Sequence, residues 1–407
     1  MGTWRYAYSF PPTLPLLAST GSTYSLSVGD IVGQDKAGTK ANETDFFKQI
    51  HWSPDGSCIL SASNDESIRL FHLPPSTLNG RSYSSGYESF CLRPGEAIQD
   101  ISWYPHMYYQ DRSTCCFLTS VRDRPIQLWD VWTGQLRASY TPMSPMEHIV
   151  TPLAISFNPE GSRIYGCAEG AIYQFDIHRP GQTGKRCPTT PTRKDPSGQK
   201  GILSCMGWNP DGSGVYAVGS YNGTVGFYTD ESPGPIDILS MGEGRRHGLT
   251  QVTFSPCGRY LYTTCRRGGT ISCWDVRATG ECLWQGDRQG DTNQRLGFSL
   301  SSDGRLLSAG DLEGNVFLWK DILEVTEEGN SDPSPYSFKA HQDAVSAAQI
   351  HPYSPLLATA SGQRHYEDPW TDSEEEDELE RTNPSSVSHD NSLKLWSLPG
   401  QWCRADG

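Results

Sequence analysis

Short runs in which apolar and polar residues alternate follow one another along the chain, and each run ends at a turn. In the first of them, Ile50-His51-Trp52 is followed by Ser53-Pro54-Asp55-Gly56. Alternation with a period of two predicts a β-strand with one buried face, and Pro or Asp-Gly predicts the turn that ends it. We therefore expect a chain built from many short strands.

This run-and-turn pattern occurs seven times at intervals of 46 to 54 residues. Its last apolar positions are Trp52, Trp103, Phe157, Trp208, Phe254, Leu300 and Ile350. A second apolar run follows each anchor, and a third run ends near an aromatic residue, as in Ile126-Gln127-Leu128-Trp129-Asp130. Three strands and a more variable fourth at this period are typical of a WD-repeat blade, and seven blades close into a ring. The sequence predicts an all-β fold, a seven-bladed WD40 β-propeller.

The two ends of the chain are expected to close the ring together. Only 11 residues follow Trp396, too few to complete the seventh blade, whereas residues 1–45 contain one apolar piece, Leu14-Pro15-Leu16-Leu17-Ala18. We expect this N-terminal segment to supply the missing outer strand; the alternative is a disordered N-terminus beside an unfinished blade. The predicted divisions are residues 1–45, a propeller over 46–400 and a C-terminal tail over 401–407.

Blade seven is interrupted by an acidic insertion at about residues 363–389. Within it, residues 367–380 hold nine acids and no base. Such a run is usually disordered and solvated, although it would also suit competition with RNA for a basic surface or recruitment of a basic partner. Ser373 precedes five consecutive acids and is a candidate phosphorylation site for an acidophilic kinase.

Composition agrees with the strand pattern, and much of the negative net charge comes from the acidic insertion. The 41 Gly and 28 Pro residues suit many turns. A formal charge of −14 argues at first against nucleic acid as a partner. Subtracting the nine charges of the insertion from −14 leaves −5 for the rest of the chain. The net charge therefore does not exclude an RNA-binding surface.

No motif predicts catalysis, a cofactor or a metal. The chain has no P-loop, H-E-x-x-H, G-x-S-x-G or C-x-x-C. His341, Ser361 and Asp390 resemble a catalytic set, but their WD-repeat positions predict a structural hydrogen-bond network with Trp396. We find no membrane span or signal peptide and expect a soluble intracellular protein, not an enzyme, whose cysteines are mostly reduced and buried.

Basic residues are concentrated at positions that form one surface of the predicted propeller. In each blade, the turn after the second strand and the connection entering the first strand lie on the same side, here called the top face. With Lys48, the basic residues of this face come from six of the seven blades. The residues predicted to bind RNA there are Arg122, Arg124, Lys200, Tyr221, Arg245, Arg246, Arg266, Arg267, Arg295 and Arg364.

These residue types suit an unpaired RNA loop. Guanidinium groups bind phosphate in pairs of hydrogen bonds and stack on bases, and a tyrosine ring stacks on unpaired nucleotides. The same groups would also suit an acidic peptide, or would pair with acids of neighbouring turns. From the residues alone, RNA and peptide remain alternatives.

Several segments are similar to the telomerase Cajal body protein family, and the similarity extends over about residues 46–397. Some of these segments lie on the top face, where Tyr221, Arg295 and Arg364 match the family. The matching segments are residues 47–48, 52–60, 125–130, 133–140, 179–181, 219–221, 292–295 and 356–364.

The resemblance implies a non-enzymatic RNA-binding propeller. Such a protein recognises a motif in the terminal loop of box H/ACA small Cajal body RNAs, telomerase RNA included, and directs these RNAs to nuclear Cajal bodies. The implied partners are those RNAs, or small nuclear RNA, and ribonucleoprotein proteins, with no membrane and no small-molecule substrate. The implied location is the Cajal body or nucleoplasm, with the cytoplasm as a further location. The alternative is a protein–protein scaffold, such as a spliceosomal snRNP accessory factor, that binds peptides on its top face.

Overall fold

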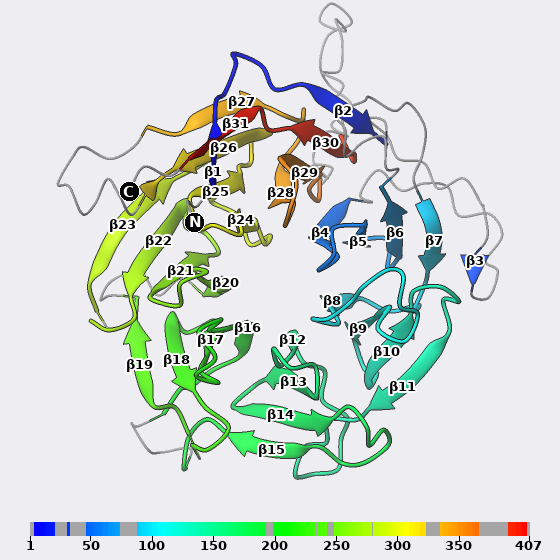
Figure 1. Ribbon diagram of the computed structural model, residues 1–407. Helices are drawn as coiled ribbons and strands as arrows, with labels where there is room; N and C mark the ends of the chain where they lie inside the picture. The colour runs from blue at the N-terminus through cyan, green and yellow to red at the C-terminus, as the bar shows by residue number, and fades with distance from the viewer. Residues whose placement is uncertain are drawn as a thin grey trace, which may run out of the picture.

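Seven antiparallel sheets surround a central axis in the computed structural model (Figure 1). Each sheet is one blade, and consecutive blades follow one another around the ring. The seven-bladed all-β propeller is therefore confirmed. The structure describes residues 4–20, 31–32, 46–73, 88–192, 198–232, 234–241, 248–278, 280–322, 334–365 and 390–404.

Blades one to four each hold four antiparallel strands in chain order, and one extra strand pairs parallel with the outside of blade one. Blade one contains β4 (Phe47–Trp52), β5 (Cys58–Ser63), β6 (Ile68–His72) and β7 (Glu88–Leu92), with β3 (Ile31–Val32) outside. Blade two contains β8 (Ile98–Trp103), β9 (Cys116–Val121), β10 (Ile126–Asp130) and β11 (Leu136–Tyr140). Blade three contains β12 (Ala154–Phe157), β13 (Arg163–Ala168), β14 (Ala171–Asp176) and β15 (Lys185–Pro188). Blade four contains β16 (Leu203–Trp208), β17 (Tyr216–Ser220), β18 (Thr224–Tyr228) and β19 (Asp237–Ser240).

Blades five and six follow the same pattern, whereas blade seven takes its outermost strand from the N-terminal segment. Blade five contains β20 (Leu249–Phe254), β21 (Tyr260–Cys265), β22 (Thr270–Asp275) and β23 (Cys282–Asp287). Blade six contains β24 (Phe298–Leu300), β25 (Leu306–Gly310), β26 (Asn315–Lys320) and β27 (Tyr336–Lys339). Blade seven contains β28 (Val345–Ile350), β29 (Leu356–Ser361), β30 (Leu393–Ser397) and β2 (Leu16–Ser19).

The seven anchor residues of the sequence pattern are the last residues of the seven innermost strands. Two of their indoles also join neighbouring blades. Trp52 Nε1 donates a hydrogen bond to the carbonyl oxygen of Gln349 at 2.9 Å, and Trp103 Nε1 donates to that of His51 at 3.1 Å. The repeated anchor is therefore both the end of a strand and a contact between blades.

The turn after the first anchor requires its glycine. Gly56 has a φ of 73°, and a Cβ there would lie 2.4 Å from the His351 ring of blade seven. The carbonyl oxygen of Gly56 lies 3.0 Å from His351 Nε2. Asp-Gly at this turn thus gives both a left-handed backbone and room for the adjoining blade.

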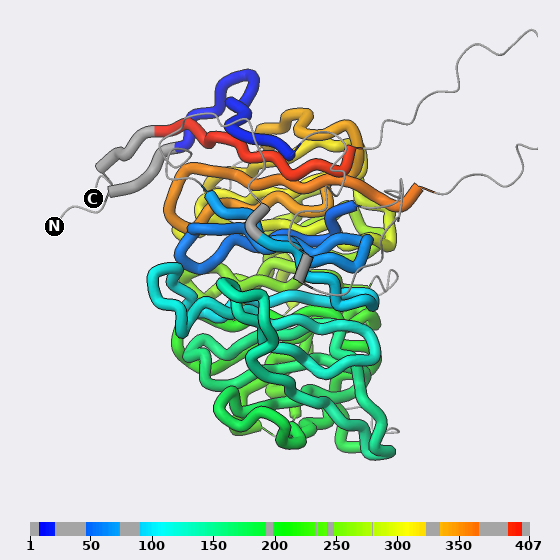
Figure 2. The backbone as a smooth tube through the Cα atoms, turned by 90° about the vertical axis from the view of Figure 1, so that its right-hand side faces the viewer, coloured from blue at the N-terminus to red at the C-terminus, as the bar shows by residue number. Residues whose placement is uncertain are grey.

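Strand β2 closes the ring, as the sequence predicts. It pairs antiparallel with β30, with Leu16 opposite Trp396 and Ser19 opposite Lys394. Beyond the ends of β2, the Ser397 amide donates to the Pro15 carbonyl at 2.9 Å. Figure 2 shows the blue N-terminal segment beside the red C-terminal strand. Blade seven is therefore complete only when both ends of the chain contribute.

Both ends also form a second pairing that the sequence pattern did not predict. Strands β1 (Trp4–Tyr8) and β31 (Gly400–Arg404) pair antiparallel in a two-stranded sheet. Residues 401–404, assigned to a tail in the sequence analysis, thus form most of a strand. Between β1 and β2, the Phe10 ring lies 4.7 Å from that of Tyr336 in blade six.

A buried hydrogen-bond network braces blade seven and contains all four residues expected there. Trp396 Nε1 donates to Thr359 Oγ1 at 2.9 Å, and His341 Nε2 lies 2.7 Å from the same oxygen. Thr359, which the sequence analysis did not name, therefore joins the indole to the imidazole. Ser361 Oγ donates to Asp390 Oδ1 at 3.2 Å, and His341 Nδ1 lies 3.4 Å from Asp390 Oδ2. Residues 366–389 of the acidic insertion, including Ser373, lie outside the described residues.

We predict that Leu17→Ala destabilises the protein by about 2–5 kcal/mol, because it removes a buried side chain from the core between β2 and its neighbours. Leu16→Ala is the matched control on the same strand, since Leu16 is 46% exposed and Leu17 only 5%. The control should change stability by less than about 0.5 kcal/mol. Urea unfolding gives both values, and equal effects of the two variants would contradict the packing of β2.

Candidate nucleic-acid interface

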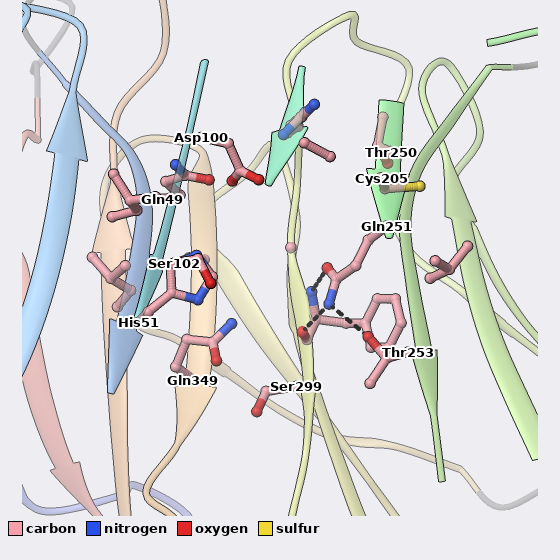
Figure 3. Close-up of a pocket in the computed structure, with 18 of the residues that line it drawn as sticks. Gln49, His51, Asp100, Ser102, Cys205, Thr250, Gln251, Thr253, Ser299 and Gln349 are labelled. Atoms are coloured by element: carbon pink, nitrogen blue, oxygen red, sulfur yellow. Dashed lines mark hydrogen bonds between the residues drawn. The ribbon is translucent and has the colours of Figure 1, made fainter. Parts of the chain in front are cut away.

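The innermost strands enclose a channel of about 670 Å³ along the axis, lined by both polar and apolar residues. Its wall includes the amide side chains of Gln49, Gln251 and Gln349, together with hydroxyl groups such as that of Ser102 (Figure 3). His51 lies on the same wall, and burial lowers its pKa to about 4, so its ring is neutral near pH 7. Lys48 and Arg295 also contribute to the lining. The start of β4 and the connection into β24, where these two residues lie, belong to the top face.

Arg295 reaches across the mouth of the channel. It lies in the connection that enters β24 in blade six, but its Nη2 donates to two carbonyl oxygens on the far side. These are Ser204 in blade four at 2.7 Å and Leu153 before blade three at 3.2 Å. Burial alone would lower the pKa of Arg295, but the nearby Asp100 and Tyr221 raise it by more, so its pKa lies above the usual value. Arg295 therefore remains charged while joining three blades.

Asp100 supplies a negative charge near Arg295. It lies on β8 in blade two, where its Oδ2 accepts a hydrogen bond from the Ile155 amide of blade three at 2.8 Å. Burial raises the pKa of Asp100 to about 6, opposed by the positive charge of Arg295 and by hydrogen bonds to the carboxylate. The start of blade three is thus held by Asp100 through the Ile155 amide and by Arg295 through the Leu153 carbonyl.

Tyr221 and Arg266 form a stacked pair on the neighbouring part of the top face. The Arg266 guanidinium carbon lies 4.4 Å from the centroid of the Tyr221 ring. Gly248 leaves room for both, because a Cβ there would lie 2.7 Å from Tyr221 Cδ1 and 3.0 Å from Arg266 Nε. Tyr221 follows β17 and Arg266 follows β21, so two adjacent blades build this platform.

Lys48 and Arg364 add positive charge at the junction of blades seven and one. Burial lowers the pKa of Lys48, and the charges of Arg364 and Arg295 lower it further. Arg364 is exposed, and its Nη2 donates to Asn64 Oδ1 at 3.3 Å. Three basic side chains from blades six, seven and one are therefore close enough to influence one another.

The connection into blade six positions two further polar groups beside this cluster. Arg267 Nε donates to Asn293 Oδ1 at 3.1 Å, with Arg267 in a left-handed conformation at φ 53°. Gln294 Nε2 donates to the Gly362 carbonyl of blade seven at 2.9 Å. Asn293 thus accepts a hydrogen bond from a side chain of blade five, and Gln294 donates one to the backbone of blade seven.

The remaining predicted RNA-binding residues are dispersed or outside the described part of the chain. Arg122 is exposed and lies 3.7 Å from the carboxylate of its neighbour Asp123. Arg124 and Lys200 are also exposed, and no described contact joins either to the Arg295 cluster. Arg245 and Arg246 lie outside the described residues.

Sequence reasoning missed Asp100, which the structure places beside Arg295. An acid in Ile98-Gln99-Asp100-Ile101, within an innermost strand, could have indicated it, because such a position faces either a blade or the channel. The stacking of Arg266 on Tyr221 gave no sequence signal, since the two residues are 45 positions apart and meet only through blade packing.

The described residues also bear on metal ligands, membrane spans and disulfides. Among the described residues, no group of three or more His, Cys, Asp or Glu side chains could hold a metal ion. No helix in the described part of the chain is long and apolar enough to cross a membrane. The cysteines in the described ranges are free thiols and most are buried, but Cys257 and Cys282 are exposed.

Comparison with known proteins assigns the family. The WD domain, G-beta repeat family matches residues 40–72, 240–275 and 333–365. Telomerase Cajal body protein 1 of Mesocricetus auratus is 33% identical over 368 residues, which cover 89% of this chain and 66% of that protein. Its Drosophila melanogaster homolog is 27% identical over 386 residues, which cover 89% of this chain and 66% of that homolog. The chain belongs to the telomerase Cajal body protein 1 family. The resemblance seen in the sequence segments is thereby confirmed.

The matched length and one further relative belong to this comparison. The chain spans 66% of the Mesocricetus auratus relative, just under two thirds of its length. Guanine nucleotide-binding protein negative regulator 1 of Schizosaccharomyces pombe is 33% identical over 303 residues, which cover 70% of this chain and 74% of that protein. Similarity therefore extends to a protein whose name refers to regulation of a guanine nucleotide-binding protein.

We predict that Gly248→Ala destabilises the protein by about 1–3 kcal/mol, because its Cβ would meet the Tyr221 backbone and ring. Gly234→Ala is the control, since a Cβ at Gly234 meets nothing within 4 Å and its φ is not in the left-handed region. The control should remain within about 0.5 kcal/mol of the parent. Chemical denaturation measures both, and an unchanged Gly248→Ala protein would contradict the close packing around Tyr221.

Proposed function

We propose that this member of the telomerase Cajal body protein 1 family is a non-catalytic RNA-binding scaffold and chaperone. Its clients are the terminal loops of box H/ACA small Cajal body RNAs, telomerase RNA among them, and it directs these RNAs within the nucleus. The names of the family relatives refer to telomerase and the Cajal body, which supports telomerase RNA as a client and the nucleus as the location. Ribonucleoprotein proteins, rather than membranes or small-molecule substrates, are its other partners.

The stacked pair of Tyr221 and Arg266 is the observation that most favours an RNA ligand. A tyrosine ring beside a guanidinium group offers a flat surface on which an unpaired base stacks, whatever its sequence. Lys48 and Arg364 lie on the same face in blades one and seven, where their charges suit phosphates elsewhere along the same RNA strand. Stacking surface and positive charge on one face fit a single-stranded loop.

The outlying basic residues have a secondary role in this proposal. Exposed side chains at the rim contact phosphates of a bound RNA one at a time, which adds affinity without sequence preference. Such contacts need no fixed geometry, so dispersed positions suffice. The exposed residues proposed for phosphate contacts are Arg122, Arg124 and Lys200, with Arg267 nearer the cluster. Arg245 and Arg246 are proposed for the same role from the sequence, since they lie outside the described residues.

A protein–protein scaffold is the second candidate, because one similar protein is named as a negative regulator of a guanine nucleotide-binding protein. That relative is covered over 74% of its own length, more than the Mesocricetus auratus protein. In this case the top face would hold an acidic peptide through the same arginines. A peptide has no unpaired bases to stack on the Tyr221 ring. Removing that ring would therefore weaken peptide binding less than removing an arginine charge would.

We predict that Tyr221→Leu weakens binding of a hairpin RNA by about 1–3 kcal/mol, the value of one stacked base. Tyr353→Leu is the control, because Tyr353 is 73% exposed in the turn after β28, on the opposite face. Titration of the labelled hairpin at about 0.15 M salt gives the affinities. A duplex of the same stem without its loop should bind weakly in every variant.

The salt dependence distinguishes a phosphate contact from a stacking contact. Arg364→Gln should reduce the slope of log K against log salt by about 0.7, the value for one single-strand phosphate, whereas Tyr221→Leu should leave it unchanged. The RNA proposal fails if the parent protein shows no dependence on the loop. Preference for an acidic peptide over the hairpin would favour the scaffold instead.

A further inference from the structure

We infer that Arg295 is a positioning residue of the RNA-binding face, with Asp100 as its counter-charge, rather than a residue that reads a base. This inference rests on the proposed RNA-binding function and concerns how the same face is built. It differs from the expectation drawn from the sequence, in which Arg295 contacts RNA directly. The hydrogen bonds across the channel mouth are the basis of the difference.

One terminal nitrogen of the Arg295 guanidinium group, Nη2, already binds two groups within the protein. Its Nη2 donates to the carbonyl oxygens of Ser204 and Leu153, and these bonds join blade six to blades four and three. A guanidinium group that reads a guanine needs two parallel donors directed at the base edge. Nη2 is one of the nitrogens that such a pair of donors would use, but here it is directed at the carbonyl oxygens of blades three and four.

Arg295 also lies near the stacking platform. A side-chain hydrogen bond with Tyr221 contributes to the raised pKa of Arg295. Arg266 lies over the ring of the same tyrosine at 4.4 Å. Arg266 thus covers one face of the Tyr221 ring, and Arg295 is near enough to Tyr221 for the two groups to interact electrostatically. Both arginines restrict where the ring lies before a base arrives.

Asp100 makes the buried position of Arg295 tolerable. A buried cation is costly unless an opposite charge or several hydrogen bonds compensate it. Asp100 is the largest influence that favours the charged form of Arg295, whereas Lys48 is a nearby cation whose own pKa Arg295 lowers. Asp100 and Arg295 also hold the start of β12 together, through Ile155 and Leu153.

The test compares Arg295→Gln, Tyr221→Phe and the double variant in the hairpin titration. Tyr221→Phe keeps the stacking ring but removes the hydroxyl group, through which Arg295 would act on the ring. We expect each single variant to weaken RNA binding, by about tenfold for Arg295→Gln. The double variant should be no weaker than Arg295→Gln alone, and the salt slope should stay at the parent value throughout. Arg364→Gln, which should lower the slope, is the reference for a phosphate contact.

A phosphate or base contact by Arg295 gives different results. A salt slope reduced by about 0.7 in Arg295→Gln, with effects that add to those of Tyr221→Phe, would overturn the inference. If Arg295→Gln does not fold, Tyr221→Phe decides alone, since parent affinity in that variant would also overturn it.

A measurement without RNA separates this inference from the proposed function. Hydrogen–deuterium exchange of peptides spanning residues 219–223 should be faster in Arg295→Gln and in Asp100→Asn than in the parent. Because no ligand is present, that result holds even if the parent binds no hairpin, in which case only the proposed function fails. Unchanged exchange in both variants would contradict the positioning role.

Discussion

The pairing of β2 with β30 is the interaction on which the rest of the molecule depends. A propeller blade buries its faces against two neighbours, so a ring with an unfinished blade leaves an open strand edge and an exposed core. The N-terminal strand completes blade seven by hydrogen bonds to β30 and by burying Leu17. Closure also fixes how the connections of blades six, seven and one meet. The cluster of Lys48, Arg295 and Arg364 exists only in the closed ring.

Position within that ring divides the arginines of the face into two kinds. Arg288 is almost fully buried and donates to backbone carbonyl oxygens around it, including those of Leu296 and Gly310. Arg295 resembles it in binding carbonyl groups, but does so across the channel mouth. Arg364 and Arg266, by contrast, lie at or near the surface, where they are able to meet a ligand. A count of basic residues on one face therefore overstates the number that bind RNA, because some hold the face together.

The repeating features of the fold were accessible from sequence, whereas contacts between blades were not. The seven anchors predicted the ends of the innermost strands because alternation and turn residues act locally. The closing strand followed from a shortage of chain after Trp396. Thr359 was missed because an equally suitable Ser361 lies two residues away on the same strand, and only the packing of Trp396 and His341 selects between them. Asp100 and the Tyr221–Arg266 stack depend on how blades meet, which one sequence does not reveal.

The central claim is that the top face holds an unpaired RNA loop over Tyr221, and crosslinking tests it most directly. The protein would be irradiated with its natural RNAs bound, after which both the crosslinked peptide and the attached RNA would be sequenced. The account predicts crosslinks at Tyr221 or its neighbours on the top face, with RNA reads concentrated in the terminal loops of hairpins. Crosslinks confined to the opposite face, or reads spread evenly over paired stems, would contradict it.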